Sequence, residues 1–560
     1  MESAVLLCTA VGTPGLFFFR GETKYFFSLF LHIVLIVTAS SWALRALSSG
    51  GLMQFNLLEL VGLPLPGNID SLGAFFLLII SLTFLAGLLY AHGYLKLYRQ
   101  TRSERQFSQH HLALLWLHIS MLLVVTLRGG AAFLAVWELM HVSAFSLVMF
   151  EGERKEILKT GVTYLVQMQI GFALLATAFL ILRASGFSFG FDGLSGYFAT
   201  HDLLPVFLLL LSGFGLSIGF VPLHSWLPST HLATPSHVSG IMSGVLIQMG
   251  FYGILRVLTF VQTDFFTISL IILALSLLSG IVGIRSAFVQ TDGKTVLAYS
   301  SIANTGIIGI GIGTGLLGLA FHHPTLAALG FTGGILHIAN HALAKSVLFY
   351  SLGSVYRATN TRTLEQLGGL IKTMPKTTVS FLLGSMALCG FPPFNGFVSE
   401  FLIYTGLIQN LGLTGGSLNL LLWTILSGLG FISLYSVFGF TKIFKTAFLG
   451  RPRSTAAAQA KEVSDGMLVP KALLVLCILA IGLFPALFIK LASQVTALYV
   501  LDLNSLGDLA PPFGYTALTG VFLAGMVFFA FRRGRPPKPA DLDYPNNRII
   551  HKLKREHRLG

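Results

Sequence analysis

The chain has 560 residues, of which 54% are hydrophobic and only 10% are charged, and its mean hydropathy is +0.78. No soluble domain of this length could hide so much apolar surface from water, so the composition excludes a soluble globular protein and indicates a polytopic membrane protein. The formal net charge of +14 is accounted for by membrane topology and contact with anionic lipids, so no nucleic-acid partner is expected.

Apolar runs of bilayer length predict an all-α fold with about 14–15 transmembrane helices. The fifteen candidate spans are residues 3–19, 25–47, 71–91, 112–128, 131–150, 160–183, 203–223, 235–260, 266–285, 295–318, 327–352, 378–410, 419–446, 470–491 and 513–532. Most lysine and arginine residues fall in loops after odd-numbered spans or in the tail from Arg532. This asymmetry predicts an N-terminus outside and a C-terminus in the cytoplasm.

Two spans that lie five apart, the seventh and the twelfth, are interrupted by glycine and proline. The interrupting residues are Gly219, Pro222 and Pro228 in the seventh span, and Gly390, Pro392, Pro393 and Gly396 in the twelfth. Paired breaks of this kind are typical of inverted repeats, because freed backbone groups survive at membrane depth only where they line a cavity. We expect His224, Pro222, Pro392, Pro393 and Asn395 to line such cavities.

The paired breaks predict two inverted five-helix repeats inside a longer chain. The expected division is residues 1–111 for the first three spans, 112–262 for the first repeat, 263–446 for the second, 447–532 for the C-terminal helices and 533–560 for a basic cytoplasmic tail. An odd number of spans per repeat inverts the second copy relative to the first.

A stripe of polar side chains marks the eleventh span. His337, His341 and Lys345 stand four residues apart in the apolar run 331–353, and with Asn340 they fall on about one helix face. A charge at the bilayer centre costs roughly 2.5–3.5 kcal/mol, so such a face is retained only toward protein or water. The stripe predicts a proton path, whereas a metal pair is disfavoured because no third ligand is evident.

Two further acids lie inside predicted spans, Glu138 in Trp-Glu-Leu-Met and Glu400 in Asn-Gly-Phe-Val-Ser-Glu. Together with the stripe they complete a candidate proton path. Structural interpretations stay open for both: Glu138 could hydrogen-bond a neighbouring helix, and Glu400, close to Asn395, could cap a broken helix.

Five segments carry a resemblance to a known family. They are Trp-Glu-Leu-Met at 137–140, Val-Pro-Leu-His-Ser-Trp-Leu-Pro at 221–228, Ala-Thr-Pro-Ser-His-Val-Ser-Gly at 233–240, Leu-Ala-Tyr-Ser-Ser at 297–301 and Asn-Gly-Phe-Val-Ser-Glu at 395–400. Over about residues 70–450 the chain resembles the antiporter-like subunits of respiratory complex I, membrane-bound hydrogenases and multisubunit sodium/proton antiporters. It is most similar to the large membrane subunit of formate hydrogenlyase and hydrogenase 4 complexes.

The resemblance assigns roles in the second half. His337, His341 and Lys345 match the family's relay, with Lys345 as the central proton carrier and the histidines as shuttles. Glu400 matches the terminal acid that faces the exit.

The first half departs from the family. Glu138 matches the family glutamate, but Ser217 and Gln248 stand where the family carries two lysines, and neither side chain titrates. Without a lysine to stabilise its charge, an uncoupled and protonated Glu138 is expected. Gln169 stands where the family often has a histidine.

The resemblance implies a proton-translocating subunit of an energy-converting hydrogenase or complex I-like oxidoreductase in a prokaryotic inner membrane. The chain carries no cluster, flavin or nucleotide motif, so nickel-iron and iron-sulfur centres are expected in partner subunits, both membrane subunits and a peripheral redox arm. Two alternatives remain: a sodium/proton antiporter module, and a structural spacer whose first half-channel is retired.

Overall fold

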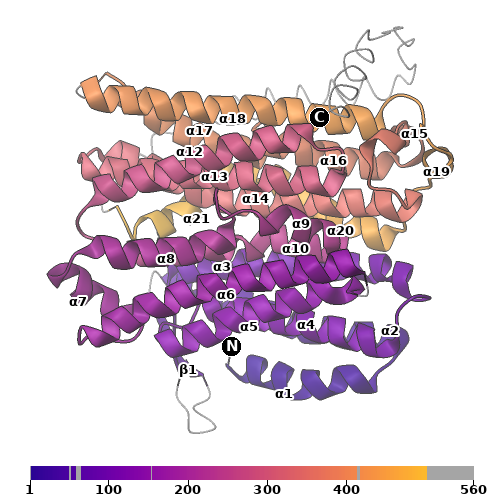
Figure 1. Cartoon of the computed structure of the whole chain (residues 1–560), viewed down its shortest axis with the longest axis horizontal. Coiled ribbons are helices and arrows are strands. Elements are labelled where there is room, and N and C mark those ends of the chain that lie inside the picture. Colours follow the sequence, from indigo (N-terminus) through magenta and orange to yellow (C-terminus); the bar gives the residue numbers. More distant parts are fainter. Residues whose placement is uncertain (1, 50–51, 58–64, 153, 413–415, 501–560) are drawn as a thin grey trace, which may run out of the picture.

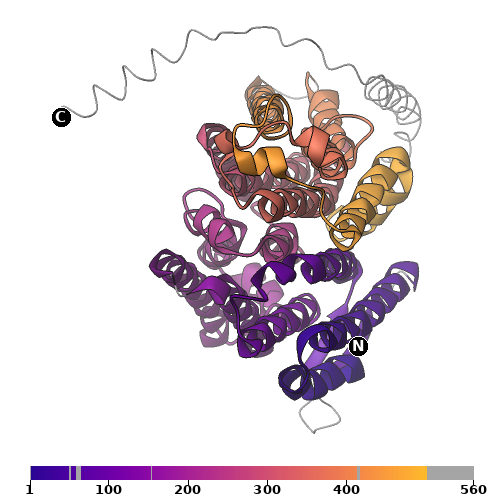
Figure 2. The same ribbon diagram turned by 90° about the vertical axis from the view of Figure 1, so that its right-hand side faces the viewer.

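The computed structural model describes residues 2–49, 52–57, 65–152, 154–412 and 416–500. The chain is a bundle of long helices that run side by side (Figure 1), and the view along the helices shows them clustered in several layers (Figure 2). Within the described ranges, 11 helices are long and apolar enough to cross a membrane. The predicted all-α membrane fold is confirmed, while the fifteenth span, 513–532, and the tail 533–560 lie outside the described residues.

The first part of the chain forms the lower half of the bundle in Figure 1. Its helices are α1 (Glu2–Phe18), α2 (Gly21–Ser49), α3 (Ser71–Leu95), α4 (Glu104–Val124), α5 (Gly130–Val148), α6 (Lys155–Ala184), α7 (Asp192–Thr200), α8 (Leu203–Ile218), α9 (Trp226–Ala233), α10 (Ser236–Ile241) and α11 (Gln248–Leu258), with a π-helical turn, η4 (Met242–Leu246), between the last two. An antiparallel hairpin, β1 (Met53–Leu57) and β2 (Leu65–Ile69), pairs Met53 with Ile69 and Leu57 with Leu65.

The second part forms the upper half. Its helices are α12 (Phe265–Val289), α13 (Gly293–Ala320), α14 (Pro324–Thr359), α15 (Leu370–Thr373), α16 (Pro375–Leu388), α17 (Asn395–Asn410), α18 (Gly416–Phe448), α19 (Thr455–Gln459), α20 (Asp465–Leu483) and α21 (Pro485–Thr496). One short 3-10 turn, η5 (Leu364–Gln366), lies in this part, and two others, η2 (Lys96–Tyr98) and η3 (Met149–Glu151), lie in the first part.

Both predicted helix breaks are present. The seventh predicted span, 203–223, contains α8, and α9 begins just beyond it. Helix α8 is followed by Gly219, whose left-handed φ of +78° suits glycine at a helix C-terminus. The twelfth is α16 followed by α17, with Gly390 at φ +65° between them. A further break divides the predicted span 470–491 into α20 and α21, because Pro485 has no N–H to continue the helix.

Helix α14 is the central helix of the second half. It packs against α13, α16, α17, α20 and α21, and 94% of its most apolar stretch is buried inside the protein. The corresponding shares are 33% for α6 and 28% for α18. The polar side chains of α14 therefore face protein, whereas α6 and α18 expose apolar surface at the outside of the bundle.

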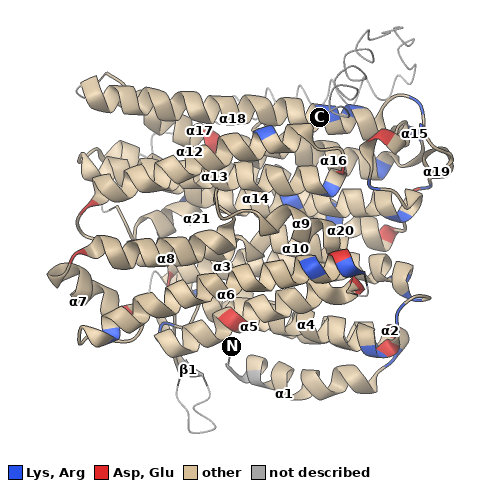
Figure 3. Ribbon diagram, in the orientation of Figure 1, with Lys and Arg blue, Asp and Glu red and all other residues tan. Residues whose placement is uncertain are grey.

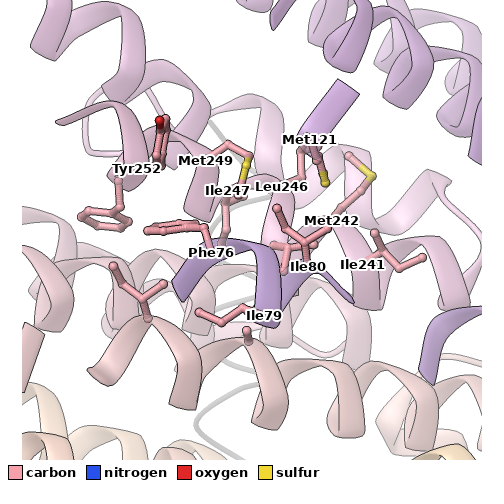
Figure 4. Close-up of a cluster of buried hydrophobic side chains, with 14 of the residues drawn as sticks. Phe76, Ile79, Ile80, Met121, Ile241, Met242, Leu246, Ile247, Met249 and Tyr252 are labelled. Carbon is pink, nitrogen blue, oxygen red and sulfur yellow. The ribbon is translucent and has the colours of Figure 1, made fainter. Parts of the chain in front are cut away.

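Apolar packing fixes the position of the helix pair α10 and α11 (Figure 4). Phe76 and Ile80 of α3 lie beside Met242 and Leu246 of η4, and Met121 of α4 closes the same cluster. Each of these side chains is at most 1% exposed, and close van der Waals packing of this kind is what associates helices in a membrane. This cluster holds η4 against α3 and thereby sets where α11 begins.

Charged residues gather at the two ends of the helices, and most lysines and arginines lie at the end where α15 and α19 are found (Figure 3). We call this end, formed by residues 96–104, 360–375 and 449–464, the connector end. Such a distribution is the one expected when the central part of each helix lies in hydrocarbon.

Candidate functional site: a buried relay on α14

Lys345 is completely buried at the interface between α14 and α13. Its Nζ donates hydrogen bonds to the carbonyl oxygen of Leu297, at 2.9 Å, and to the hydroxyl of Ser300. Both acceptors come from the Leu-Ala-Tyr-Ser-Ser segment, and both are neutral. Among the described residues no carboxylate lies within salt-bridge distance of Nζ, so the ammonium is held by oxygens that also tolerate the neutral amine.

His337 lies between α13 and α17, with a partner on each ring nitrogen. Its Nε2 is 3.2 Å from Oδ1 of Asn304, and its Nδ1 is 2.8 Å from the Ser399 hydroxyl. The Asn304 amide nitrogen donates to the Ser300 carbonyl at 2.7 Å, so Oδ1 is an acceptor and Nε2 carries the proton toward it.

The Ser399 hydroxyl can serve His337 in both protonation states. It can donate to a neutral Nδ1, or accept from a protonated Nδ1 while it donates to the Gly396 carbonyl, 3.0 Å away. A proton can therefore be added to this histidine without leaving a buried group unsatisfied.

His341 contacts the first half of the chain. Its Nδ1 lies 2.8 Å from the side-chain amide nitrogen of Gln248, the first residue of α11, and both residues are fully buried. The structure thus brings Gln248, which the sequence resemblance aligns with a family lysine, into direct contact with His341 of the second half. The glutamine amide can present either its nitrogen or its oxygen to the ring.

Glu400 is 4% exposed and accepts a hydrogen bond of 2.6 Å from the Ser433 hydroxyl of α18. The carboxylate packs directly against Gly390, where an added Cβ would lie 3.1 Å from Oε1. The break in the twelfth span therefore makes room for this acid, and Ser399, the residue before it in the chain, bonds His337.

Asn395 and Asn340 fasten the second break to α14. The Asn340 amide donates to the Asn395 carbonyl at 2.8 Å and to the Ser399 hydroxyl at 2.9 Å. Pro393 is buried and its carbonyl lies against Gly482 of α20, whereas Pro392 is partly exposed. Asn395 and Pro393 therefore pack into protein, Asn395 against α14 and Pro393 against α20.

The first half is arranged differently. Glu138 is partly buried on the outer side of α5, and its Oε1 accepts a hydrogen bond from the amide of Gln169 on α6. Ser217 is buried near the end of α8, 2% exposed. In the described part of the chain no hydrogen bond joins Glu138 to Ser217 or Gln248.

The residues at the first helix break lie near the surface of the protein. Pro222 is exposed and His224 partly exposed, and the His224 ring is 6.5 Å from that of Tyr299. His141, one turn after Glu138, bonds the Tyr164 hydroxyl at 3.0 Å. The structure brings together Gln248 and His341, whereas Glu138 contacts Gln169 and His224 lies beside Tyr299.

Several buried charges are not singled out by sequence patterns. Lys294 of α13 donates to the Thr234 carbonyl at 2.5 Å, and Lys471 of α20 is also fully buried. Each stands near the end of an apolar run, where a lysine ordinarily reaches water. Only the packing of α9, α14 and α16 over them reveals their burial.

At the end of the helix bundle opposite the connector end, the Asp70 carboxylate, at the start of α3, binds two arginines from other parts of the chain. It accepts two hydrogen bonds from Arg256, at 2.6 and 2.8 Å, and one from Arg128 at 2.8 Å. Burial alone would raise the pKa of Asp70, but the Arg256 and Arg128 guanidinium groups and the Gly73 N–H lower it well below its usual range. The available sequence signal is its place directly before an apolar run, as the N-cap of α3.

Histidine, cysteine and acidic side chains do not form groups of three or more that could hold a metal within the described ranges. His337 and His341 have separate hydrogen-bond partners on different helices. The chemistry available to this set of amine, imidazole, hydroxyl and carboxyl groups is the acceptance and release of protons.

Two broken helices beside a central helix with buried histidines and a lysine define an antiporter-like membrane protein. Residues 131–426 match the transmembrane family described as NADH:quinone oxidoreductase/Mrp antiporter, and the chain belongs to this family. The resemblance predicted from the sequence segments is confirmed.

Curated relatives include a hydrogenase component and a formate hydrogenlyase subunit. Hydrogenase-4 component B of Escherichia coli (strain K12) is 33% identical over 429 residues, which cover 74% of this chain and 61% of that protein. Formate hydrogenlyase subunit 3 of the same strain is 36% identical over 256 residues, 46% of this chain and 42% of that protein. The chain thus spans less than two thirds of the length of either relative.

A solved structure shows the same fold. A chain of the Mrp complex from Dietzia sp. DQ12-45-1b superposes with a TM-score of 0.74 and 19% sequence identity, covering 89% of this chain and 97% of that chain. At this identity the likeness concerns the fold of a multi-pass membrane protein.

Proposed function

We propose that this chain is a proton-translocating, antiporter-like membrane subunit of an energy-converting hydrogenase or complex I-like oxidoreductase. In this role Lys345 carries the proton at the centre, His337 and His341 pass it along α14, and Glu400 is the terminal site. Redox chemistry in partner subunits drives the movement, and those partners, including a peripheral redox arm, hold the nickel-iron and iron-sulfur centres.

The single observation that carries the proposal is the set of buried polar groups that links Lys345 to His337 in the second half. Ser300 contacts Lys345 through its hydroxyl and Asn304 through its carbonyl, and Asn304 contacts His337. His337 in turn contacts Ser399, the residue before Glu400. Buried ionisable residues at membrane depth mark ion pathways, because their cost is accepted only where they act.

A sodium/proton antiporter module is the second candidate, and the fold shared with a chain of an Mrp complex favours it. A structural spacer with a retired first half-channel is the third, since Ser217 and Gln248 replace two family lysines. The three candidates differ in ion movement: electron transfer drives it in the first, an ion gradient drives it in the second, and the spacer moves no ions itself.

The location that fits this role is a prokaryotic inner membrane, with lipid around the exposed apolar faces of α2, α6 and α18, the N-terminus outside and the C-terminus in the cytoplasm. The gathering of lysine and arginine at the connector end supports this orientation. Reporter fusions before Met1 and after Gly560 that respond from the same side would contradict it.

Proton movement in vesicles containing the whole complex tests the function. We expect a pH-sensitive dye to report proton movement that starts on addition of formate or hydrogen as electron donor. Exchange driven by an imposed sodium gradient without any donor would instead support the antiporter module, and the absence of both would support the spacer.

A further inference from the structure

Lys471 is a second buried ammonium group that the relay does not include. It is six residues into α20, about 9 Å along the helix from its start, and it is completely buried. Its Nζ donates to the Thr377 hydroxyl of α16 at 2.8 Å and to the Ser354 hydroxyl of α14 at 3.0 Å. A lysine this close to a helix end ordinarily extends to water, so its position between two hydroxyls on inner helices calls for a role.

On one side, Thr377 links Lys471 to the protein surface at the connector end. The Thr377 hydroxyl donates to Oε1 of Glu462 at 2.6 Å, and its backbone N–H donates to Oε2 at 3.0 Å. Glu462 lies in the segment between α19 and α20 and is partly exposed. One hydroxyl therefore separates the buried ammonium from a carboxylate that reaches the surface.

On the other side, Ser354 links Lys471 to the helix that carries the relay. The Ser354 hydroxyl donates to the Tyr350 carbonyl at 2.9 Å, and Tyr90 of α3 bonds the same carbonyl at 2.8 Å. Nearer to Lys345, the Ser346 hydroxyl lies 2.9 Å from the Ala342 carbonyl of its own helix and 3.2 Å from the Gly240 carbonyl, and the Tyr350 hydroxyl also lies against Gly240. Polar groups thus continue along α14 over the nine residues that separate Ser354 from Lys345.

We propose that Lys471 is a further proton-carrying residue, which exchanges a proton with Glu462 through the Thr377 hydroxyl at the connector end of the α14 relay. The inference rests on the proposed function, and it places proton transfer between the surface and α14 at this point. A purely structural cation, which only fastens α20 to α14 and α16, is the competing interpretation.

The transfer needs only a shift of protons along existing hydrogen bonds. The Lys471 ammonium gives one proton to Thr377 Oγ1 while Thr377 gives its own proton to Glu462 Oε1, which leaves a neutral amine and a carboxylic acid. The same two bonds reverse the shift. The net result is the transfer of one proton from Lys471 to Glu462. These two groups together have zero net charge before and after, so the step avoids an isolated buried charge.

Three substitutions test the inference in vesicles that contain the whole complex, energised with formate or hydrogen, with protons moved per electron as the readout. Lys471→Met removes the titrating group, Lys471→Arg keeps the charge but cannot release a proton, and Thr377→Val removes only the connecting hydroxyl. Lys376→Gln is the matched control, because Lys376 neighbours Thr377 in sequence but has a 69% exposed side chain.

We expect all three variants to lower the proton-to-electron ratio at least about fivefold, since a gap in a chain of titrating groups must otherwise be bridged by water. The control should match the unmodified complex. Normal pumping by Lys471→Arg would assign Lys471 a fixed structural charge and overturn the inference, and normal pumping by Thr377→Val would do the same. If Lys471→Met fails to assemble, the other two variants decide.

Lys345→Ala, measured beside them, separates the two proposals. Loss of pumping in Lys345→Ala together with normal pumping in the Lys471 and Thr377 variants overturns only this inference. Normal pumping in Lys345→Ala overturns the proposed function itself.

Discussion

The side-chain amide of Gln248 lies 2.8 Å from Nδ1 of His341, and this contact joins the first half of the chain to the relay of the second. A glutamine can donate to a neutral imidazole or, with its amide turned, accept from a protonated one. A lysine at the same place could only donate, and its charge would oppose protonation of His341. The residue at position 248 in the first half therefore determines the surroundings of His341 in the second half.

Gln248→Lys is expected to impair coupled proton movement, because the new ammonium would stand against His341 on the helix that also carries Lys345. Gln248→Met, which has similar size and no charge, should have a smaller effect, since it removes one hydrogen bond worth about 0.5–1.5 kcal/mol. Protons moved per electron in vesicles with the whole complex provide the measurement. Full coupling in Gln248→Lys would show that protonation of His341 is not required.

Ser399→Ala is expected to slow proton movement, because His337 loses the hydroxyl that serves Nδ1 in both protonation states. The matched control is Ser436→Ala on α18, a buried serine whose hydroxyl donates to the Ile432 carbonyl of its own helix. Both variants should assemble, and only the first should lower the rate of proton movement. Equal rates in the two variants would remove Ser399 from the path.

Glu138→Gln should be mild in this protein. The carboxylate contacts Gln169 on the outer side of α5 and α6, and a glutamine can keep that contact. Coupling is expected to stay within about twofold of the unmodified complex, far from the loss expected for Lys345→Ala. A loss as severe as that of Lys345→Ala would mean that the first half conducts by a route without lysine.

Asp70→Asn should destabilise the protein by about 3–5 kcal/mol, because it leaves the buried Arg256 guanidinium without its counter-charge. The lowered pKa of Asp70 fixes the sign of the pH dependence: its contribution is present above the ordinary aspartate range and is lost only in strongly acidic solution. Thermal unfolding in detergent should therefore show the same loss of stability in Asp70→Asn at every pH from about 5 to 8. Asp465→Asn, at an 85% exposed side chain, is the control and should leave stability unchanged.

The parts of the structure that depend on local chemistry could be predicted from the sequence. Glycine and proline located both helix breaks, and the spacing of four residues placed His337, His341 and Lys345 on one face of a buried helix. These features follow from backbone geometry and from the cost of charge in a membrane.

Contacts between helices could not be predicted in this way. The partners of His341 and His337, Gln248 and Ser399, are 93 and 62 residues away in the chain, so no local pattern connects them. Lys471 stands at the beginning of its predicted span, and its burial depends on α14 and α16 packing over it. The break before Pro485 was missed because the apolar run continues through it.

Lys345→Arg provides the most direct test of the relay. The guanidinium keeps the charge but does not release a proton at accessible pH, so assembly and electron transfer should persist while coupled proton movement is lost almost as completely as in Lys345→Ala. Proton-to-electron ratios of both variants, measured in vesicles with the whole complex, would contradict the account if Lys345→Arg pumps at the unmodified rate.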